Sequence, residues 1–166
     1  LAHPGKSRGP GDPNPGYYYN GRYHLQYLIK AKPHGYGYAH VSSKDMVHWK
    51  WHPTTVLAAN MGHNIYSGGD FFTKDGKPAM IYHGVSDSKN FISYALDDQL
   101  EEWSKPQPVI PLNSTGQPAD MSYWDPDCWL RDSTYYSISG HSDLNQGPTI
   151  ARSSDLKTWK YMGDFF

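Results

Sequence analysis

The sequence predicts an all-β protein of the β-propeller class, in which these 166 residues supply about three blades. Trp49, Trp103 and Trp159 recur 54 and 56 residues apart, and each ends a short segment that begins with aspartate. Three runs of strand-forming residues precede each tryptophan, and no stretch has the apolar period of an amphipathic helix. A period of about 50 residues with several strands per repeat is typical of propeller blades.

The first predicted blade covers residues 17–60. Its aromatic runs 17–19 and 22–28 flank Asn-Gly at 20–21, which is a strong signal for a tight hairpin. A third run follows at 36–42 and leads to the first of the three tryptophans.

The same plan predicts a second blade over residues 65–112 and a third over residues 123–163. Asp75-Gly76 is the hairpin turn of the second blade. Dispersed glycine and proline residues, 16 and 13 of them, suit many short strands joined by turns. A β-sandwich in which the tryptophan spacing is accidental is the alternative.

Three blades do not close a propeller, because propellers close with about four to eight. We therefore expect residues 1–166 to be the N-terminal part of a single β-propeller catalytic domain. The expected partners of the chain are then the remaining blades of the same protein.

Composition narrows the class of ligand. The formal net charge of −1 gives no basic field for nucleic acid or a membrane surface, and no apolar run reaches membrane-spanning length. Aromatic residues make up 15% of the chain, with 14 Tyr and 6 Trp. Sugars pack their C–H faces on aromatic rings, so a carbohydrate substrate is predicted.

The cellular compartment is weakly constrained. One cysteine excludes an intrachain disulfide. Residues 1–16 lack an apolar signal segment, so any secretion signal is absent or already removed. We expect a secreted or periplasmic protein, and the sequence leaves a cytoplasmic location open.

Aspartates stand near the start of each predicted blade. Asp12 precedes the first strand, Asp70 lies in the first run of the second blade, and Asp125 and Asp127 begin the third. Carboxylates from successive blades can face one axial pocket, and glycoside hydrolysis needs such a pair. The plainer interpretation is that Asp12 and Asp125 form turns before proline, that Asp70 caps a turn, and that Asp127 binds backbone.

Several motifs then resemble glycoside hydrolase family 32, the invertases, levanases and inulinases. Asp12-Pro-Asn-Pro-Gly16 and Tyr23-His-Leu-Gln-Tyr27 are similar to the family's opening motifs. Ala39–Trp49 looks like its Ser-x-Asp-Leu-Val-His-Trp run, Ser67-Gly-Gly69 its Ser-Gly-Ser, and Trp124-Asp-Pro126 its Arg-Asp-Pro. The resemblance implies a five-bladed β-propeller, of which this chain supplies about the first three blades.

The resemblance also implies an activity, the retaining hydrolysis of β-fructofuranosides such as sucrose, levan or inulin. Asp12 matches the nucleophile and Asp125 the transition-state stabiliser. The family's general acid is a glutamate in the following blade, which places it beyond residue 166. Substrate contacts are expected from four further residues: Ser67, Asp70, Trp124 and Tyr38.

Departures from the family pattern keep other functions open. Gly11 stands where the family has Asn, Leu28 where it has Gln, Trp124 where it has Arg, and Tyr38 where it has Trp. These positions contact the terminal fructose in the family. A propeller glycosidase acting on arabinosides or xylosides, or a non-catalytic glycan-binding propeller, is therefore the alternative.

No metal and no cofactor are predicted. His48 and His52 lack a supporting carboxylate or cysteine cluster, and no zinc-type spacing occurs. His40 and His83 are expected to hydrogen-bond between blades. The glutamates at 101–102 are interpreted as solvated charges of a turn, and the single cysteine has no arrangement that suits a thiol nucleophile.

Overall fold

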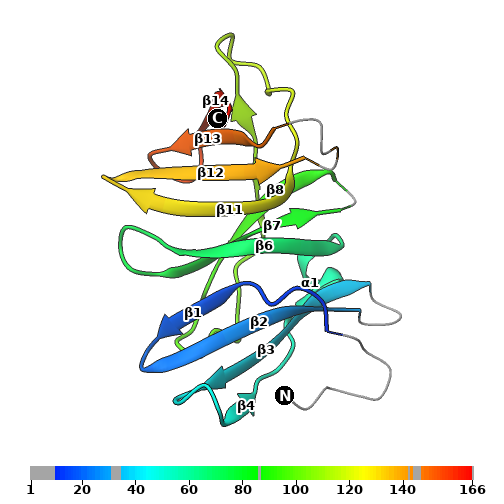
Figure 1. Ribbon diagram of the computed structural model, residues 1–166, viewed down its shortest axis with the longest axis vertical. Coiled ribbons are helices and arrows are strands. Elements are labelled where there is room, and N and C mark those ends of the chain that lie inside the picture. Colours follow the sequence, from blue (N-terminus) through cyan, green and yellow to red (C-terminus); the bar gives the residue numbers. More distant parts are fainter. Residues whose placement is uncertain (1–9, 31–34, 86, 142, 144–146, 166) are drawn as a thin grey trace.

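The computed structural model describes residues 10–30, 35–85, 87–141, 143 and 147–165. Within them the chain is all-β apart from a single helical turn, α1 (Ala58–Met61), so the all-β prediction is confirmed. Fourteen strands form three sheets, which follow one another along the longest axis of the molecule (Figure 1). No helix in this described part is long and apolar enough to cross a membrane.

The first sheet is an antiparallel meander with the order β1-β2-β3-β4, and β5 also pairs with β3. Asn20 and Gly21 both have positive φ, 48° and 71°, as the predicted two-residue hairpin requires. The strands are β1 (Gly16–Tyr19), β2 (Arg22–Lys30), β3 (Tyr36–Ser43), β4 (Trp49–Trp51) and β5 (Val56–Leu57).

The second sheet has the order β6-β7-β8-β9 and is antiparallel throughout. Its hairpin turn contains Gly76, as predicted, with φ of 76°. Its strands are β6 (Ile65–Phe72), β7 (Pro78–Gly84), β8 (Lys89–Tyr94) and β9 (Gln107–Val109).

The third sheet has the order β10-β14-β13-β12-β11. A single residue separates β10 from β9 of the second sheet, but β10 belongs to the third sheet because it pairs in parallel with β14. The predicted second blade, which ended at residue 112, therefore includes two residues that belong to the third sheet. The strands are β10 (Pro111–Leu112), β11 (Trp124–Arg131), β12 (Thr134–Gly140), β13 (Thr149–Ser153) and β14 (Trp159–Asp164).

Each sheet contains an aspartate-capped turn, which has one form in the first and third sheets and a longer form in the second. Asp45 Oδ1 accepts the backbone N–H groups of Val47 and His48, at 2.9 and 2.8 Å. Asp155 accepts the equivalent two N–H groups of the third sheet at the same distances. In the second sheet the accepting residue is Asp97, one position before the aspartate that the sequence pattern suggested.

The three tryptophans complete these turns in one way. Each indole N–H donates to the carbonyl oxygen three residues earlier, at 3.1 Å for Trp49 and Trp103 and 3.2 Å for Trp159. The accepting residues, Met46, Leu100 and Leu156, all have positive φ, of 61°, 56° and 64°. The repeat seen in the sequence is therefore a repeated turn, and its tryptophan begins β4 in the first sheet, begins β14 in the third and forms a bridge with Ala95 in the second.

Apolar layers lie between neighbouring sheets. Burying such area supplies most of the driving force for docking sheets face to face, at roughly 25 cal/mol per Å². The layer between the first and second sheets includes Tyr38, Val56, Met61, Ile65, Met80, Tyr82 and Phe91. The layer between the second and third includes Phe71, Ala79, Ile81, Ile92, Val109, Cys128, Tyr135, Ala151, Leu156 and Trp159.

Candidate active site

A cavity of about 600 Å³ opens where the first strands of the sheets converge. It is lined by the loop before β1, by β6 and by the bulged start of β11. Four aspartates contribute to it, although they lie far apart in the sequence: Asp12, Asp70, Asp125 and Asp127. A cluster of carboxylates in one concave site is the arrangement from which glycoside hydrolysis is built.

Asp12 is held by both of the first two sheets. Its carbonyl oxygen accepts Leu28 N–H at 3.0 Å, and Gly11 N–H donates back to the Leu28 carbonyl at 2.6 Å. The Ser67 hydroxyl of β6 donates to Asp12 Oδ2. One carboxylate oxygen is thereby oriented by the neighbouring sheet.

Gly11 and Leu28, two of the residues that depart from the motif described above, lie in direct contact. A Cβ added at Gly11 would lie 3.0 Å from Leu28 Cβ and 3.2 Å from its carbonyl oxygen. The glycine thus allows the Asp12 loop to lie directly on the leucine of β2. The packing of the Asp12 loop on β2 therefore depends on the absence of a side chain at residue 11.

Asp70 both lines the cavity and fixes the entry of β1. Its Oδ1 accepts Gly16 N–H at 3.0 Å, while Asn14 Oδ1 accepts Gly68 N–H at 3.4 Å. Burial raises the pKa of Asp70, the charge of Asp127 adds to this, and the Gly16 N–H opposes it. Asp70 therefore lines the cavity and also binds β1 of the first sheet, a contact across 54 residues that differs from the turn cap considered as the alternative.

Asp125 sits on a β-bulge. The pairing of β11 with β12 shifts between Trp124 and Asp127, and Asp125 has φ of 41°. Such a backbone is uncommon for a residue other than glycine, and bulges often re-aim a side chain next to a site. Partial burial raises the pKa of the Asp125 carboxyl, the charge of Asp12 raises it further, and His83 opposes.

Asp127 accepts the backbone N–H of Cys128 at 2.8 Å. This contact fits the predicted structural role, but the side chain also lines the cavity. A Cβ at Gly69 would lie 2.3 Å from Asp127 Oδ1, so the glycine is what lets β6 and β11 approach this closely.

Comparison with known proteins identifies the family. Residues 10–166 match the family described as "Glycosyl hydrolases family 32 N-terminal domain". The chain belongs to glycoside hydrolase family 32.

The similarity of this family 32 chain extends to characterised relatives. It is 33% identical over 175 residues to β-fructofuranosidase, insoluble isoenzyme 6, of rice, which covers 90% of the chain and 28% of that enzyme. It is 27% identical over 193 residues to the extracellular exo-inulinase of Aspergillus niger, covering 93% of the chain and 35% of the inulinase. The chain therefore spans about a third of these relatives or less.

Solved structures show the same fold. Fructan 1-exohydrolase IIa from Cichorium intybus superposes with a TM-score of 0.74 at 24% identity, over 92% of this chain and 31% of that one. Sucrose-6-phosphate hydrolase from Lactobacillus gasseri gives 0.71 at 26%, over 93% and 34%. The chain thus has the all-β fold of five-bladed propeller structures, as predicted, and it aligns with about the first third of their length. A GH43_1 enzyme from Xanthomonas citri, with xylose bound, matches the fold at 11% identity and a TM-score of 0.71.

Four of the six predicted site residues of this family 32 chain meet in the cavity, and two lie outside it. Tyr38 is only 1% exposed, and its hydroxyl donates to the Tyr66 carbonyl at 2.6 Å. Its face of β3 packs against the second sheet, so we no longer expect Tyr38 to touch a sugar. Trp124 is 37% exposed and lies beside the cavity, its ring 5.3 Å from that of His83.

The structure also corrects expectations about histidine and glutamate. The His40 ring contacts His24 of its own sheet, and its other nitrogen, Nδ1, has no hydrogen-bond partner in the part of the chain that the structure describes. His48 and His52 do have carboxylate partners, Asp45 at 2.8 Å and Glu101 at 2.6 Å. The glutamate that we interpreted as a solvated charge is therefore part of the junction between the first two sheets.

Proposed function

We propose that the complete protein hydrolyses β-fructofuranosides of the sucrose, levan or inulin type, with retention of configuration. Asp12 is the nucleophile and Asp125 the transition-state stabiliser in this proposal. It is supported by family membership and by the observation that Asp12 and Asp125, from different sheets, line one cavity. A retaining glycosidase needs a carboxylate within reach of the anomeric carbon and a second carboxyl group as acid.

The contacts of Asp12 suit a nucleophile. The Ser67 hydroxyl engages Oδ2, which leaves Oδ1 for attack on the anomeric carbon. The bond from that carbon to the leaving oxygen breaks as the leaving oxygen takes a proton from the general acid. Water then attacks the fructosyl–Asp12 ester, the acid residue now accepts the proton of water, and Asp12 is released.

Asp125 stabilises charge in the proposed reaction. The sugar ring becomes positive as the leaving group departs, and a fixed carboxylate beside it lowers the energy of that state more than that of the neutral substrate. Ser67 and Asp70 are proposed to contact sugar hydroxyls, and Trp124 to offer a ring at the edge of the cavity.

The general acid is proposed to come from outside this chain. Among the described residues that line the cavity, none is a glutamate or a histidine. Glu101 is engaged with His52 elsewhere. The remaining blades of the protein would supply the acid, and a secreted location is proposed from the printed description of the Aspergillus relative as extracellular.

The test uses the complete protein with sucrose, levan and inulin, and with aryl arabinosides and xylosides as the contrasting substrates. Early NMR spectra are expected to show fructose released in the β configuration, before mutarotation. Release of the inverted product would contradict the assignment of Asp12 as nucleophile. Hydrolysis of the arabinosides and xylosides alone would show that the substrates are pentosides and not fructosides. Saturable binding of fructan without any hydrolysis would favour the glycan-binding alternative.

A further inference from the structure

One face of the first sheet changes from apolar to polar side chains along β2 and β3. Leu28 of β2 pairs with Tyr38 of β3, and both belong to the apolar layer against the second sheet. Side chains of alternate residues share a face, so this face continues with polar residues towards the hairpin end. These residues are Gln26, His24, His40 and Ser42. They form a buried polar half of the junction between the first two sheets.

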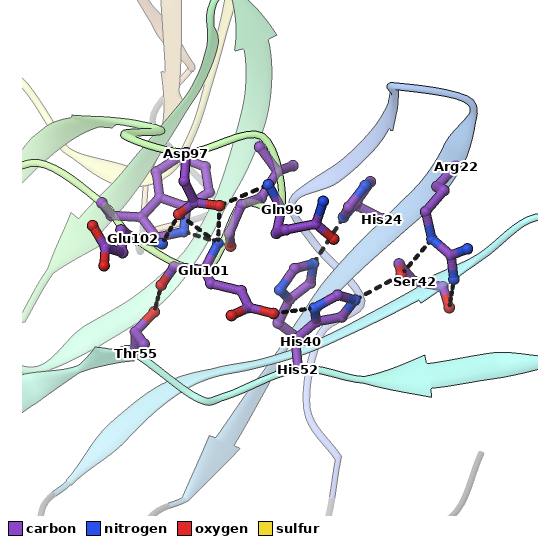
Figure 2. A network of polar contacts seen from close by, with 12 residues as sticks. Arg22, His24, His40, Ser42, His52, Thr55, Asp97, Gln99, Glu101 and Glu102 are labelled. Atoms are coloured by element: carbon purple, nitrogen blue, oxygen red, sulfur yellow. Dashed lines mark hydrogen bonds and ion pairs between the residues drawn. The ribbon is translucent and has the colours of Figure 1, made fainter.

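Three histidines meet in this polar half (Figure 2). His24 and His40 are 3% exposed and His52 is 6% exposed. One ring nitrogen of each lies within 4.8 Å of the others, and His24 Nδ1 is 3.0 Å from His40 Nε2. The ring centroids are 5.2 Å apart for His24 and His40, 4.2 Å for His40 and His52, and 6.0 Å for His24 and His52.

We propose that His24, His40 and His52 form a binding site for a divalent transition-metal ion of the kind that prefers imidazole ligands, such as Zn²⁺. Three histidines with an open fourth position are a frequent ligand set for zinc, and imidazole also suits copper and nickel. Among the residues that the structure describes, this is the group whose ligand atoms converge closely enough to hold an ion.

The distances require a modest adjustment. Zinc–nitrogen bonds of about 2.0–2.1 Å in a tetrahedral site place the nitrogens about 3.4 Å apart. The 3.0 Å separation of His24 and His40 is already close to this value. His52 must turn towards them, because its Nε2 now accepts the Ser42 hydroxyl at 2.7 Å. Rotation of one ring closes the remaining gap, which is at most 4.8 Å.

The rings can present lone pairs to a cation. His24 and His40 are both buried, and burial disfavours the charged imidazolium form, so the rings are suited to act as neutral ligands. His24 Nε2 and His40 Nδ1 have no hydrogen-bond partner among the described residues. Without an ion, one of the two facing nitrogens donates its proton to the other across 3.0 Å. A cation would replace that proton, which the same ring can then carry on its outer nitrogen.

Glu101 supplies the outer contact that such a site needs. Metal-ligating histidines usually donate their second ring N–H to a carboxylate or carbonyl. His52 Nδ1 lies 2.6 Å from Glu101 Oε1, and Glu101 comes from the turn of the second sheet. Its charge offsets that of Arg22, whose Nε donates to Ser42 at 2.9 Å. A bound ion would tie the first sheet to the second.

The same contacts have the order of a hydrolytic triad, Ser42–His52–Glu101, but they do not make one. Ser42 is completely buried, so no substrate reaches its hydroxyl. Its oxygen also receives the N–H of Arg22, which draws electron density away from a nucleophile. A small ion that is bound during folding meets no such barrier, because metal binding and folding are coupled.

The test titrates Zn²⁺ into the chelator-treated full chain by calorimetry and records the visible spectrum with Co²⁺. We expect one ion per chain, a rise in melting temperature, and absorption bands of a tetrahedral nitrogen-ligated cobalt site. Failure of the wild-type chain to bind one zinc ion, or an octahedral cobalt spectrum, would overturn the proposal.

Variants locate the site. His40→Gln is expected to abolish one-to-one binding, and Glu101→Gln to weaken it by about 10- to 100-fold. His48→Gln is the matched control, because His48 also has a carboxylate partner but its side chain is 87% exposed. Binding that survives His40→Gln, or is lost in His48→Gln, assigns the ion to another place. Circular dichroism checks folding, and should His40→Gln not fold, the wild-type cobalt spectrum and Glu101→Gln decide.

Discussion

Replacement of Asp12 by asparagine is expected to lower the kcat of the complete protein by about three orders of magnitude or more, which corresponds to about 4 kcal/mol or more in the barrier. The amide keeps the shape of the carboxylate and still accepts the Ser67 hydroxyl, so folding should persist. It cannot form the ester intermediate, because a neutral amide is a poor nucleophile. Initial rates on sucrose and inulin, with melting curves, measure the effect.

Asp132→Asn is the control for this experiment. Asp132 lies in the turn between β11 and β12, its side chain is 93% exposed, and its carboxylate is 3.6 Å from Nε of the neighbouring Arg131. We expect its rate to equal that of the wild type. An Asp12→Asn protein with near-normal turnover, or one that fails to fold while the control folds, would contradict the assignment of Asp12 as nucleophile.

Asp125→Asn should lower kcat by about 10²- to 10³-fold, with a smaller change in KM. The expected magnitude is that of removing one group that stabilises transition-state charge. The loss should fall on kcat because the sugar is positive only in the transition state. Asparagine tolerates the left-handed backbone of Asp125, so strain is not added.

Asp132 is again the matched position, since its φ of 46° is close to the 41° of Asp125. Asp132→Asn therefore controls for the backbone as well as for the loss of charge. If Asp125→Asn raised KM and left kcat unchanged, Asp125 would bind the ground state and not the transition state. Equal effects of the two variants on melting and rate would leave no role for Asp125 in the chemistry.

The parts of the fold that the sequence predicted are those made by local contacts. Asn20-Gly21 needs only its own backbone to form the hairpin, and each tryptophan bonds a carbonyl three residues away. Such features can be predicted from the sequence because the interacting groups are close together in the chain. The carboxylates of the cavity were found for a related reason, since each lies just before or within the first strand-like run of its predicted blade.

What the sequence could not predict depends on which strands and faces meet. The histidine cluster exists because His24 and His40 share a face of paired strands, and no spacing in the sequence states that register. The parallel pairing of β10 with β14 joins residues 48 positions apart, such as Pro111 and Trp159. Tyr38 was expected at the cavity because its neighbours resembled a motif, but its side chain is buried in the apolar layer between the first two sheets.

The crowding of carboxylates in the cavity has an electrostatic consequence for the choice of substrate. Asp12, Asp70, Asp125 and Asp127 line it, and no lysine or arginine is among the described residues that do so. The resulting negative potential favours a sugar that becomes cationic and repels one that already carries phosphate. We therefore expect kcat/KM to be higher for sucrose than for sucrose 6-phosphate, most clearly at low ionic strength, where repulsion is least screened.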